Sequence, residues 1–117
     1  MKTVLISKDL FFITKIKEVA SQSGHEVIVV KNEDALLGAS RDPDFAGIVL
    51  VDVEKMPFSL EVLTSATKDL RANNCKFYSF FSHIRPEVGG QVREALGGEV
   101  IPRSRFVQLL PNIFSSM

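Results

Sequence analysis

The chain has 117 residues, which is the size of one domain, and its 45% hydrophobic content is enough to build a buried core. Its 14 basic residues balance its 14 acidic residues, so the totals do not favour nucleic acid or an anionic membrane as a partner. One cysteine excludes an intrachain disulfide, and no apolar run is long enough to span a bilayer. We therefore expect a single cytoplasmic domain over residues 1–117.

Five short apolar segments predict β-strands. The first three consist almost wholly of β-branched residues and leucine, without the alternation of a half-exposed strand. Continuous apolar character is typical of strands covered on both faces, as in a parallel sheet. The five segments are Thr3–Ile6, Val27–Val30, Ile48–Val51, Phe77–Phe81 and Glu99–Ile101.

Helix signals separate these strands. The residues expected to cap or open the helices are Asp9, Asn32, Ser59, Pro86 and Ser104. The expected stops are Gly24, Asp42-Pro43-Asp44, Asn73-Asn74 and Gly97-Gly98. Pro111 is expected to shorten or kink the last helix, because proline cannot donate a helical hydrogen bond. Right-handed crossovers then turn five βα units into a doubly wound parallel sheet with helices on both faces.

The polar residues that follow the first, third, fourth and fifth strands are candidates for a site. In an open parallel sheet, ligands bind at the carboxyl ends of the strands, near the point where the strand order reverses. We therefore expect the polar residues at these ends to form one pocket. They are Ser7, Lys8 and Asp9 after the first strand, Asp52 after the third, Ser82 after the fourth and Arg103 after the fifth.

This arrangement resembles the receiver domains of response regulators, and the resemblance extends over the whole chain. Val49-Leu50-Val51-Asp52 matches the segment that carries the phosphoacceptor, with Ser82 at the hydroxyl position and Arg103 at the basic position. The resemblance implies a flavodoxin-like (βα)5 fold of three α/β/α layers and the strand order 2-1-3-4-5. It also implies a role in two-component signalling or a phosphorelay.

The departures from the receiver pattern indicate a degenerate, pseudo-receiver-like member. Receivers carry two acidic residues after the first strand that hold Mg²⁺, and here these positions are Ser7 and Lys8. Asp9 comes one residue later, where it is better placed as a helix cap. We therefore expect no cofactor and lost or weak Mg²⁺ binding. Our hypothesis is that the Lys8 ammonium pairs with Asp52, while Arg103 either clasps Asp52 or points to solvent.

The expected function is a stand-alone signalling or adaptor domain that acts through protein–protein interaction, without conventional aspartyl phosphorylation and without enzymatic activity. By resemblance, its partner is expected to bind around Pro86–Leu96 and Arg103–Ile113, and a second copy of the chain is a further option. The first alternative is a working single-domain regulator phosphorylated on Asp52. The second is a flavodoxin-like module that binds a small anion through Lys8, Asp52, Ser82 and Arg103.

The cysteine, one histidine and several phenylalanines have structural rather than functional interpretations. Cys75 is expected to be a plain thiol and His83 a surface histidine, and no His or Cys cluster has metal-ligand spacing. A group of phenylalanines is expected in the core rather than on a nucleic-acid stacking surface. They are Phe11, Phe12, Phe77, Phe80 and Phe81.

Overall fold

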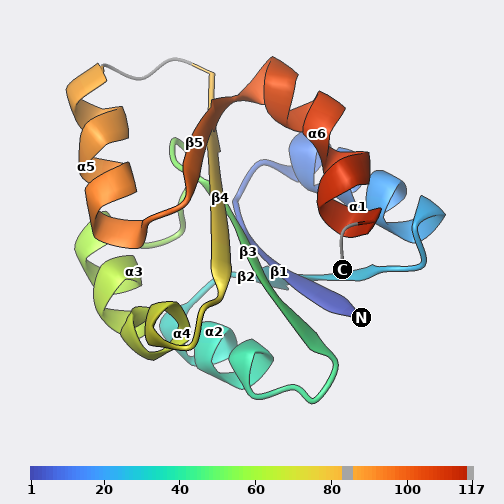
Figure 1. Ribbon diagram of the computed structural model, residues 1–117, viewed down its shortest axis with the longest axis horizontal. Helices are drawn as coiled ribbons and strands as arrows, with labels where there is room; N and C mark the ends of the chain where they lie inside the picture. The colour runs from blue at the N-terminus through green and yellow to red at the C-terminus, as the bar shows by residue number, and fades with distance from the viewer. Residues whose placement is uncertain (83–85, 116–117) are drawn as a thin grey trace.

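The computed structural model describes residues 1–82 and 86–115, which form an α/β fold around one parallel sheet (Figure 1). The described strands lie in the order β2-β1-β3-β4-β5, as expected from the sequence. Every neighbouring pair of these strands is parallel. The strands are β1 (Lys2–Ile6), β2 (Glu26–Val30), β3 (Phe45–Asp52), β4 (Lys76–Phe81) and β5 (Glu99–Pro102).

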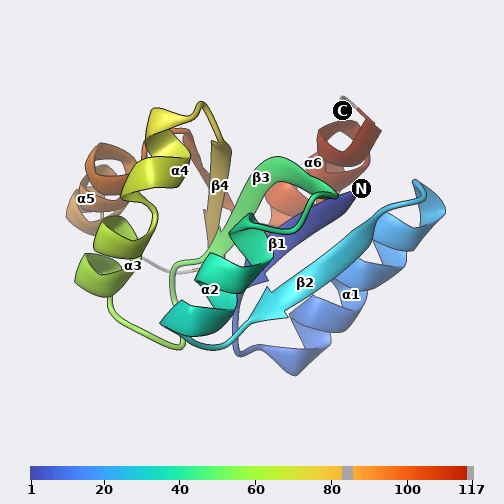
Figure 2. The same cartoon turned by 90° about the horizontal axis from the view of Figure 1, so that it is seen from below.

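Six helices in the described part of the chain cover both faces of the sheet. Figures 1 and 2 show α1 and α6 on one face and the other four helices on the opposite face, which makes three layers. No helix within residues 1–82 and 86–115 is both long and apolar enough to cross a bilayer. The helices are α1 (Leu10–Gln22), α2 (Glu33–Ser40), α3 (Leu60–Ala66), α4 (Lys68–Ala72), α5 (Pro86–Leu96) and α6 (Arg103–Ser115).

Each face of the sheet has its own hydrophobic core. Leu5 and Leu50 point toward α1 and α6, whereas Val4 and Val49 point toward α2, α3 and α5. Successive strand side chains alternate between faces, so a sheet covered on both sides needs apolar residues at every position. This explains the uninterrupted apolar runs of the central strands.

The first three predicted N-caps are confirmed. Asp9, Asn32 and Ser59 each accept a hydrogen bond from the backbone amide three residues later, at 3.2, 2.8 and 3.2 Å. The predicted Ser104 cap is wrong: β5 passes directly into α6, which begins at Arg103, so Ser104 lies in its first turn.

Pro111 does not shorten α6, so the first of the two expected effects is wrong, and a kink stays a prediction. The helix continues to Ser115 with Pro111 inside it and exposed to solvent. Ile113 and Phe114, which follow the proline, are both buried in the core under α1 and α6. Their burial offsets the loss of one helical hydrogen bond.

The predicted third helix is divided into α3 and α4 at Thr67. Arg71 donates through Nη2 to the carbonyl of Thr64 at 2.6 Å, so a side chain takes the carbonyl that a continuous helix would bond to a backbone amide. Arg71 also donates through Nη1 to the carbonyl of Ala95 at 2.5 Å, which ties α4 to the end of α5. The helix therefore breaks where the arginine joins three elements.

Gly97 and Gly98 end α5 with φ angles of +72° and +71°, in the left-handed region that favours glycine. A Cβ added at Gly98 would lie 2.0 Å from the backbone carbonyl oxygen of Phe77, whereas one at Gly97 would meet nothing within 4 Å. Gly98 is therefore required for its left-handed backbone and for its close approach to Phe77, whereas Gly97 is required for its left-handed backbone alone.

We expect Gly97→Ala to lower the free energy of unfolding by about 1 kcal/mol, the cost of a left-handed alanine. Gly98→Ala should lower it by about 3 kcal/mol or more, because the backbone of β4 must also move. Urea unfolding of both variants measures the difference. Equal losses would show that the close approach to Phe77 does not constrain the turn.

Candidate functional site

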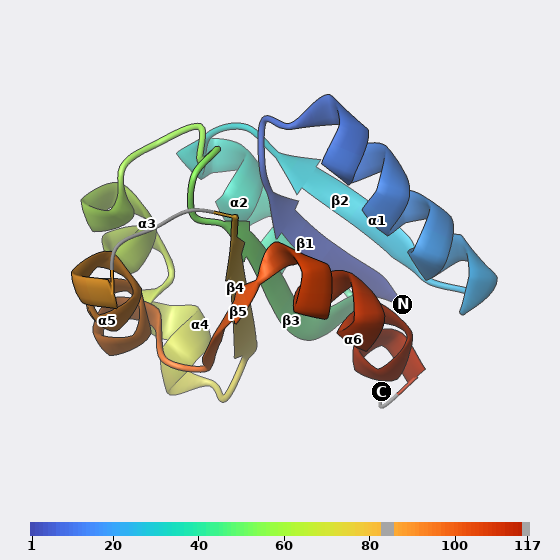
Figure 3. The ribbon, with the colours of Figure 1, turned by 90° about the horizontal axis from the view of Figure 1, so that it is seen from above.

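The candidate site begins where β1 and β3 end side by side. Ile6 pairs with Val51, so Ser7 and Asp52 come next to each other at the point where the strand order reverses. Figure 3 looks onto this carboxyl edge, where the loops after β1 and β3 lie and β5 passes into α6. Ser7 donates from Oγ to Asp52 Oδ2 at 2.8 Å.

Asp52 is buried, with 0% of its surface exposed. Its second oxygen, Oδ1, accepts hydrogen bonds from the backbone amides of Glu54 and Lys55, both at 3.2 Å. Both carboxylate oxygens are therefore engaged by the protein. The two amides also shape the loop between β3 and α3, because a carboxylate that bonds the amides two and three residues later forms a turn.

Arg103 supplies the cation beside this carboxylate. Its Nη2 lies 3.1 Å from Asp9 Oδ2 and 3.6 Å from Asp52 Oδ2. The guanidinium carbon also lies 4.3 Å from the centre of the Phe12 ring, which favours a cation through the ring's electron-rich face. Arg103 opens α6 and Asp9 caps α1, so this ion pair joins both helices to the end of β3.

The predicted pair between Lys8 and Asp52 is wrong. The Lys8 side chain is exposed and forms no ion pair within residues 1–82 and 86–115. The cation beside Asp52 is Arg103 instead. Ser7 continues the alternation of β1 and points to the α1 and α6 face, so the next side chain turns away. The amide of Lys8 also donates to the carbonyl of Lys55 at 2.8 Å, which holds its backbone at the rim.

Ser82 joins the site indirectly, through a residue that the sequence analysis missed. Glu54 Oε1 accepts hydrogen bonds from both the backbone amide and the hydroxyl of Ser82, the latter at 2.9 Å. Since the amide of Glu54 donates to Asp52, the ends of β3 and β4 are connected by consecutive contacts. In the sequence, only the position of Glu54 two residues after Asp52 could have indicated that it belongs to the site. His83 lies outside the described residues.

Three solved structures with a similar fold are those of response regulators. Chemotaxis protein CheY4 of Vibrio cholerae superposes with a TM-score of 0.74 and 14% identity over 98% of this chain and 96% of that one. A response regulator from Thermotoga maritima gives 0.73 and 16%, over 97% of each chain. The phosphorylated cyanobacterial regulator RcpA gives 0.70 and 18%, over 96% and 89%. The chain has the receiver-domain fold. No protein-family model and no curated protein matches its sequence.

Within this receiver fold, the residues beside Asp52 do not suit Mg²⁺. The Arg103 guanidinium lies against the carboxylates of both Asp9 and Asp52. Ser7 offers a hydroxyl whose proton already points to Asp52. Mg²⁺ is held through carboxylate oxygens, and a fixed cation beside them opposes it. In the described part of the chain, no three His, Cys, Asp or Glu side chains gather as a metal site.

The two carboxylates of the site titrate in opposite directions. Burial raises the pKa of Asp52 above the usual aspartate value, and the hydrogen bond from Ser7 and the charge of Arg103 offset this only in part. The amide of Phe12 holds the pKa of Asp9 below its usual value, and Arg103 adds to the effect. The protein therefore stabilises the charged form of Asp9, whereas burial disfavours the charged form of Asp52.

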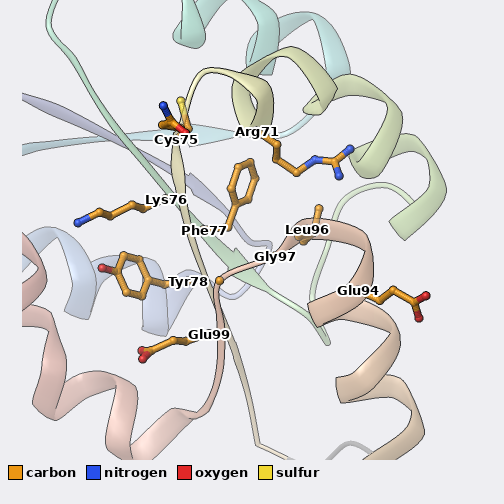
Figure 4. A pocket seen from close by; sticks show the side chains of 11 residues that line it. Arg71, Cys75, Lys76, Phe77, Tyr78, Glu94, Leu96, Gly97 and Glu99 are labelled. Carbon is orange, nitrogen blue, oxygen red and sulfur yellow. The ribbon is translucent and has the colours of Figure 1, made fainter.

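A cavity of about 680 Å³ lies elsewhere, around the beginning of β4 and the end of α5 (Figure 4). Its labelled side chains do not converge: Arg71 and Phe77 lie on one side of β4, and Lys76 and Tyr78 on the other. Cys75 is half-buried there, and burial raises the pKa of its thiol, so the thiolate is disfavoured. We therefore take Asp52, rather than this cavity, as the candidate site.

The opposite shifts predict a pH signature in stability. The contribution of Asp52 is greatest below the unfolded aspartate pKa of about 4 and is lost as the pH rises through its higher folded pKa. Asp52→Asn should therefore gain stability relative to the wild type between pH 4 and 7. The contribution of Asp9 is present above about pH 4 and is lost below, so Asp9→Asn should lose most at neutral pH. Urea unfolding from pH 3 to 7 measures both, and a parallel response of the two variants would contradict the assignment.

Proposed function

We propose that this chain is a receiver-type signalling domain in which protein groups permanently occupy the site around Asp52. The observation that carries the proposal is the buried Asp52 carboxylate, bonded to Ser7 and two amides with Arg103 at 3.6 Å. An aspartate that accepts a phosphoryl group needs an open oxygen and a divalent cation to neutralise the charge. Here both oxygens are engaged, and the neutralising charge is a fixed side chain.

In this function the domain acts as an adaptor in two-component signalling, through protein binding and without catalysis. Arg103 is the first residue of α6, so contacts made by α6 are directly coupled to the Asp9 and Asp52 carboxylates. The faces of Pro86–Leu96 and Arg103–Ile113 remain the expected partner surface. A receiver domain of NtrC4, one of the similar structures, forms a dimer in its beryllofluoride-activated form, which makes a second copy a reasonable partner to test.

The two alternative functions have less support. The neighbours RcpA, which was solved phosphorylated, and Rcp1, which was solved with Mn²⁺, have the same fold, but the arginine and serine around Asp52 oppose that chemistry here. A small-anion module would need several free donors at the pocket, and of its two predicted cations only Lys8 forms no ion pair within residues 1–82 and 86–115. Arg103 is already paired with carboxylates, and both donors of Ser82 already bond to Glu54.

The test is to incubate the protein with Mg²⁺ and acetyl phosphate and to measure its intact mass. We expect no phosphate adduct on the wild type. We expect an adduct on the triple variant Ser7→Asp/Lys8→Asp/Arg103→Lys, because it restores two carboxylates for the metal and removes the guanidinium. The adduct should disappear when Asp52→Asn is added.

The control is Lys17→Asp/Ser21→Asp, which adds the same negative charge at exposed positions of α1. It should remain without adduct, which separates a local metal site from a change in net charge. Thermal unfolding confirms that each variant is folded before the assay. A stable, Mg²⁺-dependent adduct on wild-type Asp52 would refute the proposal and favour the phosphorylated regulator.

A further inference from the structure

The most exposed large hydrophobic residues in residues 1–82 and 86–115 are neighbours at the start of α1. Phe11 is 93% exposed and Leu10 is 71% exposed. Phe11 was expected in the core, and this expectation is wrong because Phe12, Ile13 and Ile16 form the buried stripe of the helix. A helix turns about 100° per residue, so the position before Phe12 points away from the core.

The first turn of α1 is held firmly from beneath. Asp9 caps it and pairs with Arg103, and Phe12 packs against the rings of Phe80 and Phe106 at centroid distances of 4.9 and 6.1 Å. Phe11 cannot turn inward, since its neighbour already fills that space. A rigid helix therefore presents an aromatic side chain to solvent, and such an anchor loses little entropy when a partner covers it.

The charge around this pair is positive. Lys8 precedes it, Lys15 lies one turn further on the Phe11 side of the helix, and Lys55 is joined to Lys8 through the backbone. These three lysines are exposed and form no ion pair within the described ranges 1–82 and 86–115. The first turn of α1 contains no acidic residue, and the Asp9 carboxylate is already paired with Arg103.

We propose that Leu10 and Phe11, with Lys8, Lys15 and Lys55 around them, form a protein-binding surface for an acidic segment that presents an apolar groove. The apolar pair supplies the buried centre of the contact, and the lysines supply the complementary rim. This surface lies at the start of α1 and differs from the α5, β5 and α6 face.

Two other occupants fit the surface less well. A membrane-binding helix needs an apolar face along several turns, whereas the turn after Phe11 presents Thr14 and Lys15 and the longer apolar stripe of α1 is buried. A second copy packed through the same patch would bring Lys8 and Lys15 against their own counterparts, and facing like charges oppose association. An acidic protein partner satisfies both the apolar pair and the lysines.

The experiment places the photo-crosslinking residue p-benzoylphenylalanine at position 11 and, as a control, at position 37 on α2, in the full chain expressed in its native host. Crosslinked peptides are then sequenced by mass spectrometry. We expect an adduct from position 11 to a protein segment with net negative charge and apolar residues, and no such adduct from position 37. Lys8→Glu/Lys15→Glu should abolish it, whereas Lys8→Glu with Lys17→Glu, which makes the same change in charge, should retain part of it, because Lys17 lies on another side of α1.

Affinity of the purified chain for a synthetic peptide of the crosslinked segment gives the quantitative test. Phe11→Ser should weaken binding by about 30-fold or more, the effect of losing a central anchor. Phe11 is exposed, so this variant should unfold at the wild-type temperature, which separates lost binding from lost folding.

Each other outcome overturns the proposal. These are a crosslink to a basic segment, a crosslink unaffected by the lysine substitutions, or no adduct at position 11. Phe11-dependent pelleting with phosphatidylserine vesicles would assign the surface to a membrane. A dimer in sedimentation velocity that is lost in Phe11→Ser would assign it to a second copy.

Discussion

The fold around this site depends on one buried carboxylate that must be neutralised. Asp52 ends the central strand β3 with no exposed surface, and a charge in that position is costly unless other groups compensate it. The protein supplies a hydroxyl from β1, two amides from its own loop and a guanidinium from α6. Three segments that are distant in sequence, the ends of β1 and β3 and the start of α6, therefore meet at one carboxylate.

Much of this arrangement follows from the sequence. Uninterrupted apolar strands predict a sheet covered on both sides, and the order of caps and stops predicts the crossovers. Once the strand order places β1 beside β3, parallel pairing puts Ser7 next to Asp52 without further information. The serine was correctly placed for this reason, as were the caps at Asp9, Asn32 and Ser59, which act over only three residues.

The failures share a different cause, because they depend on side-chain direction or on contacts between distant elements. Lys8 was predicted to pair with Asp52, but Arg103 lies there instead. Charge alone does not say which of two cations points toward the carboxylate. The break at Thr67 depends on Arg71 reaching a carbonyl one helix away, and local pattern contains no record of that contact. Phe11 was assigned to the core by its hydrophobicity, although the helical period around Phe12 places it outside.

The arginine also changes what the site can sense. A divalent ion exchanges with solvent, so a site that depends on it responds to occupancy, whereas Arg103 is tethered to the first turn of α6 and always charged. Asp9 lies 3.1 Å from the same guanidinium and caps α1. A displacement of Arg103 would therefore change the contacts at the starts of both α1 and α6. Leu10 and Phe11 follow that cap directly. A partner that binds α1 and one that binds α6 would therefore act on the same ion pair from opposite sides, and coupling between them requires only that each favours a different position of Arg103.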